Sequence, residues 1–185
     1  NTTASNNTAV GYQAAFSNTT GASNVVVGTQ ALYANTTGRD NSAFGESTLA
    51  SNTTGSFNAA FGGRNTGSTL AALGSNSTGS FNTALGIAAL AGNTTASYNT
   101  GVGYVSLRSN TTGSENTAIG YGSLTTNTTG SFNAAIGLSS LSANTTGASN
   151  TGLGHGALAA NTTASNNTAV GYQAGYSGTT GNSNV

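Results

Sequence analysis

Few side chains of this 185-residue chain could take part in acid–base or nucleophilic chemistry. The sequence has one histidine, His155, and three acidic residues, Asp40, Glu46 and Glu115, scattered along the chain. Nothing in the pattern brings two carboxylates together for general acid–base catalysis. A serine nucleophile would need a base and an orienting acid, which this scatter does not provide. We therefore expect no catalytic residue and no enzyme activity.

Metal and cofactor sites are not expected either. The chain has no cysteine, so a disulfide framework and a thiolate metal site are both excluded. Hard cations such as calcium need clustered carboxylates, and the chain has too few. Strings such as Gly101-Val-Gly103 lack the third glycine and the following helix of a dinucleotide site.

Charge and hydropathy exclude further classes of function. Only 3% of the residues are charged, with three arginines, no lysine and a net charge of zero. This gives no basic patch for a phosphate backbone, so nucleic-acid binding is not expected. No run approaches the roughly 20 apolar residues that cross a bilayer, so we expect no membrane insertion in this segment. A chain with so little charge repels its own copies weakly, which favours association.

The asparagines and threonines show how the chain is organised. Asn-Thr-Thr recurs every 17 residues, with one step of 24 between Asn52 and the variant Asn76-Ser-Thr. The longer step predicts a seven-residue insertion at 63–69, after Gly62. Residues 161–174 repeat residues 1–14, so a 160-residue block restarts at Asn161. We interpret 1–185 as one repeat array with coils starting at 1, 18, 35, 52, 76, 93, 110, 127, 144, 161 and 178.

A second asparagine follows six residues after each first one. Buried amides stacked coil upon coil can satisfy donor and acceptor along the stacking axis. The spacing therefore predicts a structural asparagine ladder. Its members are Asn7, Asn24, Asn41, Asn58, Asn82, Asn99, Asn116, Asn133, Asn150 and Asn167.

Three residues beyond each ladder asparagine stands a large apolar residue, and a glycine follows it. We expect this apolar residue to share a core with the leucine found four residues after the glycine in most coils. The glycine is interpreted as a corner that needs positive φ or leaves no room for a Cβ. The corner glycines are Gly11, Gly28, Gly45, Gly62, Gly86, Gly103, Gly120, Gly137, Gly154 and Gly171.

The repeat length indicates the fold class. Seventeen residues are too few for a helix pair, whereas short segments such as Thr117–Ile119 suit strands joined at glycine corners. We predict an all-β fold, a parallel β-solenoid or β-roll of 17-residue coils stacked about 4.8 Å apart. Such a rod buries little apolar surface per coil, so contacts between chains are expected to add stability.

The strings Asn116-Thr-Ala-Ile-Gly120, Asn7-Thr-Ala-Val-Gly11 and Asn82-Thr-Ala-Leu-Gly86 resemble the head repeats of trimeric autotransporter adhesins. They are also similar to repeats of phage tail fibre and tail spike proteins, and the likeness spans nearly the whole chain. The resemblance implies a left-handed β-roll, an intertwined homotrimer and a place on the cell or virion surface. The partners it implies are other copies, as a homotrimer or filament, and a host-surface receptor or glycan.

We therefore expect a structural extracellular fibre or adhesin segment, a rigid self-associating rod used for surface attachment. Two alternatives remain open. The first threonine of each Asn-Thr-Thr could form a threonine ladder that binds ice. Asn-Thr-Thr is also an N-glycosylation sequon, which would suit a glycosylated extracellular filament. The candidate glycosylation sites are Asn1, Asn18, Asn35, Asn52, Asn93, Asn110, Asn127, Asn144 and Asn161.

Overall fold

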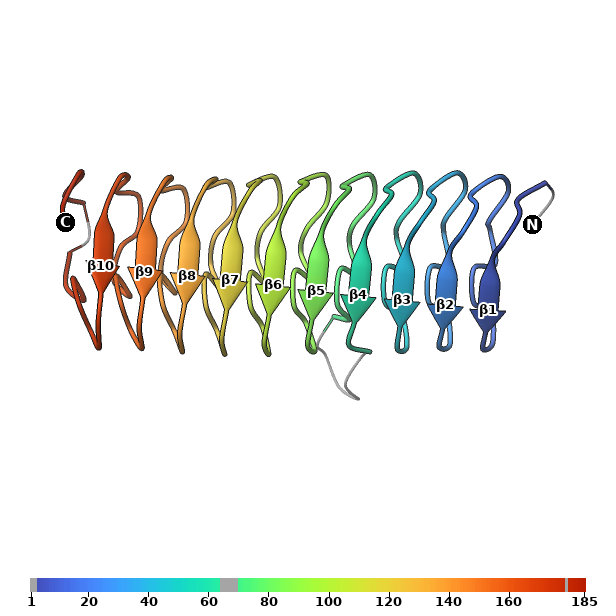
Figure 1. Cartoon of the computed structure of the whole chain (residues 1–185), viewed down its shortest axis with the longest axis horizontal. Coiled ribbons are helices and arrows are strands. Elements are labelled where there is room, and N and C mark those ends of the chain that lie inside the picture. Colours follow the sequence, from blue (N-terminus) through green and yellow to red (C-terminus); the bar gives the residue numbers. More distant parts are fainter. Residues whose placement is uncertain (1–2, 64–69, 179) are drawn as a thin grey trace.

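The computed structural model describes residues 3–63, 70–178 and 180–185 as a stack of coils, with the two termini at opposite ends of the rod (Figure 1). The described residues form no helix, and therefore none that could span a membrane. They form ten short strands in one parallel sheet whose order follows the chain. The predicted parallel β-solenoid is confirmed. The strands are β1 (Thr8–Val10), β2 (Val25–Val27), β3 (Ser42–Phe44), β4 (Ala59–Phe61), β5 (Thr83–Leu85), β6 (Thr100–Val102), β7 (Thr117–Ile119), β8 (Ala134–Ile136), β9 (Thr151–Leu153) and β10 (Thr168–Val170).

Strand pairing follows the repeat in the sequence. Thr117 of β7 lies opposite Ala134 of β8, 17 residues later, and only β4 and β5 pair with an offset of 24. The hydrogen bond that closes each corner normally spans three residues, but in the fourth coil it runs from Ala72 N to Gly62 O, across ten. Seven extra residues therefore leave the coil there. Of the insertion predicted at 63–69, residues 64–69 lie outside the described residues.

A thin core runs along the rod. It contains the middle residue of strands β2 to β10, which is alanine, valine or glycine, and the leucine four residues after the corner glycine. The leucines pack directly above one another from coil to coil. They are Leu32, Leu49, Leu73, Leu90, Leu107, Leu124, Leu141 and Leu158, all buried.

The expectation that the large apolar residue before each corner glycine enters the core is wrong. Side chains alternate along a strand, so when the middle residue points inward the third residue must point outward. Leu85 is accordingly 50% exposed and Ile119 39%. We call these residues the outer apolar column. Its members are Val10, Val27, Phe44, Phe61, Leu85, Val102, Ile119, Ile136, Leu153 and Val170.

The corner glycines are explained by both reasons suggested from the sequence. Their φ angles lie between 122° and 149°, a region that side-chain-bearing residues rarely adopt. Space is also lacking, since a Cβ on Gly120 would lie 2.7 Å from the carbonyl oxygen of Gly137 in the next coil. Each corner therefore rests directly on the backbone of its neighbour.

Candidate interaction surfaces

The second asparagine of each coil forms the ladder expected from the spacing. The Oδ1 atom of Asn116 accepts hydrogen bonds from the backbone N of Asn133 at 3.0 Å and from its Nδ2 at 3.1 Å. The Asn116 Nδ2 in turn donates to Asn99 Oδ1 at 3.2 Å and to the carbonyl oxygen of Gly130 at 2.8 Å. The amides are buried and their bonds point inward, so this ladder holds coils together and offers nothing to a ligand.

The first asparagine of each Asn-Thr-Thr forms another internal ladder. Asn127 Nδ2 donates to Asn110 Oδ1 at 2.8 Å and to the Gly130 carbonyl oxygen at 2.9 Å. An N-linked glycan is attached through this same nitrogen, which has no access to solvent in the folded coil. A glycan on these asparagines would have to displace the ladder hydrogen bonds, so the folded coil does not favour the glycosylation alternative at the buried positions, which stays a prediction; Asn1 lies outside the described residues. The buried positions are Asn18, Asn35, Asn52, Asn93, Asn110, Asn127, Asn144 and Asn161.

The threonine ladder considered for ice binding is also engaged within the rod. Thr36 Oγ1 donates to the carbonyl oxygen of Thr53 at 3.1 Å, and Thr111 Oγ1 donates to that of Thr128 at 3.0 Å. These side chains are half-buried. Their hydroxyl hydrogens join coil to coil, so the row does not present free donors to an ice surface.

The ionisable side chains lie apart on the surface. Asp40 forms a loose ion pair with Arg39, whose Nε lies 3.9 Å from the carboxylate, and both side chains are exposed. His155 packs edge-on against the ring of Tyr172, with centroids 5.2 Å apart. Within the described ranges, no three histidine, aspartate or glutamate side chains come close enough to hold a metal ion.

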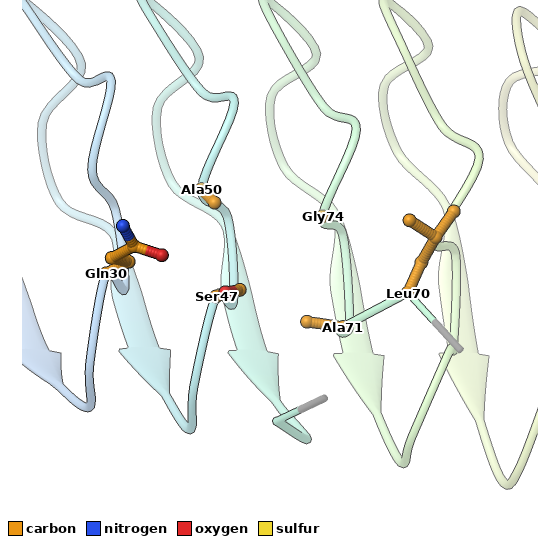
Figure 2. Close-up of a pocket in the computed structure, with 6 residues that line it drawn as sticks. All are labelled: Gln30, Ser47, Ala50, Leu70, Ala71 and Gly74. Atoms are coloured by element: carbon orange, nitrogen blue, oxygen red, sulfur yellow. The ribbon is translucent and has the colours of Figure 1, made fainter. Parts of the chain in front are cut away.

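A shallow pocket of about 320 Å³ lies beside the coil that carries the insertion (Figure 2). Its lining contains no ionisable group, and the Gln30 amide already donates to Gln13 Oε1 at 3.2 Å. A small-molecule site needs several convergent polar groups, which this pocket lacks. The lining residues are Gln30, Ser47, Ala50, Leu70, Ala71 and Gly74.

Aromatic rings stack from coil to coil on the surface. The Phe57 and Phe81 ring centroids lie 4.9 Å apart with planes 6° from parallel, and Tyr98 continues the stack at 5.0 Å and 2°. Phe44 and Phe61 of the outer apolar column stack in the same way, at 4.7 Å and 6°. Within each stack the facing sides of neighbouring rings cover each other, while the side chains stay partly exposed.

The outward side of the sheet forms a further regular surface that runs along all ten strands. We define the outer sheet face as the first and third residues of strands β1 to β10, so it combines the outer apolar column with a neighbouring column of smaller residues. None of the side chains in either column is charged. The smaller residues are Thr8, Val25, Ser42, Ala59, Thr83, Thr100, Thr117, Ala134, Thr151 and Thr168.

Sequence reasoning missed this face, although the sequence contains a signal for it. The middle residue is alanine or glycine in nine of the ten strands, as at Ala118 and Gly152, and valine in β2, whereas the third residue ranges from valine to phenylalanine. A closely packed interior column tolerates little change in volume, so the column of variable size is the one that faces solvent.

Comparison with family models, with curated proteins and with solved structures found no match to this chain. The resemblance to adhesin and tail-fibre repeats therefore stays a prediction, and the functional argument rests on the geometry of the coils.

Proposed function

We propose that this chain is a structural segment of an extracellular fibre or adhesin, a rigid self-associating rod for surface attachment with no enzymatic role. The observation that carries the proposal is the uniformity of the described coils. One backbone register and the same buried asparagine ladders recur along the rod, while the few ionisable side chains lie apart on its surface. A uniform stack of this kind suits a load-bearing or spacing role.

Rigidity follows from the way neighbouring coils are joined. Thr111 N donates to Thr128 O, Thr117 N to Asn133 O and Leu124 N to Ser140 O, so hydrogen bonds occur on every side of the coil. The asparagine ladders add buried bonds inside that ring of contacts. Bending the rod would stretch the hydrogen bonds between coils on its convex side, so the bonds resist bending. As in other solenoids, each coil contacts only the coils directly before and after it.

Electron microscopy of the purified chain, combined with a retention assay on cells, glycans and abiotic surfaces, tests the proposal. We expect rods about 50 Å long per chain, assembled into larger particles and retained on at least one surface. A compact particle with no elongated form, or rods that no tested surface retains, would contradict the proposed attachment role.

A further inference from the structure

The outer sheet face is an extended uncharged surface that combines a large apolar column with a column made mostly of threonine, and most of its large residues stay exposed among the described residues. Strand alternation places its two columns on the same side of all ten strands. Seven members of the outer apolar column are exposed, with Leu85 at 50% and Val170 at 65%. We infer that a second copy of this chain packs on this face, sheet against sheet. The inference rests on the proposed self-associating rod and identifies the surface responsible.

The size of the face fits an interface between copies. Ten strands spaced about 4.8 Å apart give a length of about 45 Å, and a three-residue strand with its side chains is about 13 Å wide. The face therefore covers about 600 Å² per copy, or about 1,200 Å² in a pair, the lower end of stable specific interfaces. An uncovered patch of this size is at the upper limit for a soluble monomer.

The chemistry of the face favours another copy over other occupants. The ten large side chains of the outer apolar column carry no hydrogen-bonding group, and the neighbouring column offers only single hydroxyls such as those of Thr83 and Thr117. The face therefore has none of the carboxylate or amide side chains that would bind the hydroxyls of a glycan in pairs. Stacking of a sugar on an aromatic ring needs a free ring face, and the facing sides of the Phe44 and Phe61 rings cover each other. The absence of charged side chains from both columns also removes any attraction for an acidic or basic partner.

A second copy matches the face in its strand spacing and in its alternation of large and small side chains. Its strands repeat at the same interval, and its large outer apolar residues can enter the column of smaller residues such as Ala59 and Ala134. Two sheets packed in this way lie about 10 Å apart with interdigitated side chains. With no charge on the face and a net charge of zero on the chain, little electrostatic repulsion opposes the pairing.

The test places charges on this face and compares them with equal charges elsewhere on the same coils. The face variant carries Leu85→Lys, Ile119→Lys and Leu153→Lys, and the matched control carries Thr78→Lys, Thr112→Lys and Thr146→Lys, all at exposed positions. Sedimentation equilibrium of the full chain gives the self-association constant. We expect the face variant to associate at least about 100-fold more weakly than the wild type, and the control to change by less than about threefold.

Circular dichroism and the unfolding midpoint establish that each variant is folded. If the lysine face variant does not fold, Leu85→Thr, Ile119→Thr and Leu153→Thr replace it, because threonine keeps strand propensity while reducing apolar area. A face variant that associates as tightly as the wild type would overturn the inference but leave self-association of the rod intact. A wild-type chain that stays monomeric at high concentration would overturn both.

Discussion

At the scale of single residues, buried amides provide much of the contact between coils. Asn116 accepts two hydrogen bonds from Asn133 and donates to Asn99 and Gly130, so one side chain connects three successive coils. A buried polar group that loses its partner costs more than the hydrogen bond itself was worth. Each asparagine is therefore a larger determinant of stability than its size indicates.

Replacing Asn116 by alanine should lower the free energy of unfolding by about 3 kcal/mol or more, because it leaves several buried groups of neighbouring coils without partners. Urea unfolding measures the loss. Thr112→Ala, in the same coil at an exposed position, should change stability by less than about 0.5 kcal/mol. Equal effects of the two substitutions would show that the ladder does not stabilise the rod.

The corner glycines allow a second comparison at this scale. A Cβ on Gly120 would meet backbone atoms of Gly137 at 2.7 Å, with φ at 129°, so Gly120→Ala should destabilise the protein by at least about 3 kcal/mol. Gly122 has φ 64° and its nearest atom to a Cβ is Thr125 Oγ1 at 3.4 Å. Gly122→Ala should therefore cost about 1 kcal/mol, since only the left-handed conformation is penalised. Thermal unfolding of both variants checks the difference, and a similar loss at the two sites would rule out backbone contact as the cause.

At the scale of the strand and its coil, the structure separates an inner leucine column from an outer apolar column. Both columns are apolar in sequence, but only Leu124 and its equivalents contact the buried strand residues. The inner leucine column therefore stabilises the fold, whereas the outer apolar column is exposed and available for the proposed contacts with another chain.

Leu124→Ala should therefore lower the free energy of unfolding by about 2–5 kcal/mol through the cavity it leaves. Ile119→Ala, in the same coil, should cost less than about 1.5 kcal/mol because its side chain is 39% exposed. Chemical denaturation at a concentration below that at which sedimentation detects self-association gives both values. The reverse order would restore the sequence-based expectation that Ile119 belongs to the core.

The ladder of first asparagines is interrupted at its C-terminal end. Asn161 Oδ1 is buried and has no hydrogen-bond partner among the described residues, because Gly178 stands where the other coils carry asparagine. A Cβ on Gly178 would meet nothing closer than Gly175 O at 3.6 Å. Gly178→Asn should therefore stabilise the 161–177 coil by about 1 kcal/mol, measured as slower amide hydrogen exchange. Gly178→Ala adds the Cβ without the amide, and an equal gain there would contradict the ladder explanation.

Much of the coil could be predicted from the sequence because its determinants recur at fixed spacing. The period of 17 predicts the strand register, and the invariant asparagines and glycines predict the ladder and the corner. The direction of the strand side chains was harder to predict, since Ala118 and Ile119 are both apolar and alternation allows only one of them to face inward. The choice depends on the narrow space left beside Leu124, which is a property of the packed coil.

At the scale of the whole molecule, the described chain is a stack of similar coils. Each described coil contacts its sequence neighbours, and the strand order follows the chain without a crossover (Figure 1). Length should then depend on the number of coils alone, while stability grows with the number of interfaces between them. The outer sheet face lengthens in the same proportion, so each added coil also enlarges the surface for a second copy.

Small-angle X-ray scattering of a variant lacking residues 110–160 tests this account most directly. The deletion removes three whole coils and joins Ser109 to Asn161, which preserves the order of coil positions. We predict a folded rod about 14 Å shorter than the full chain, with the same cross-section and an unchanged circular dichroism signal per residue. An unfolded product, or a particle of unchanged length or altered cross-section, would contradict a rod of interchangeable coils.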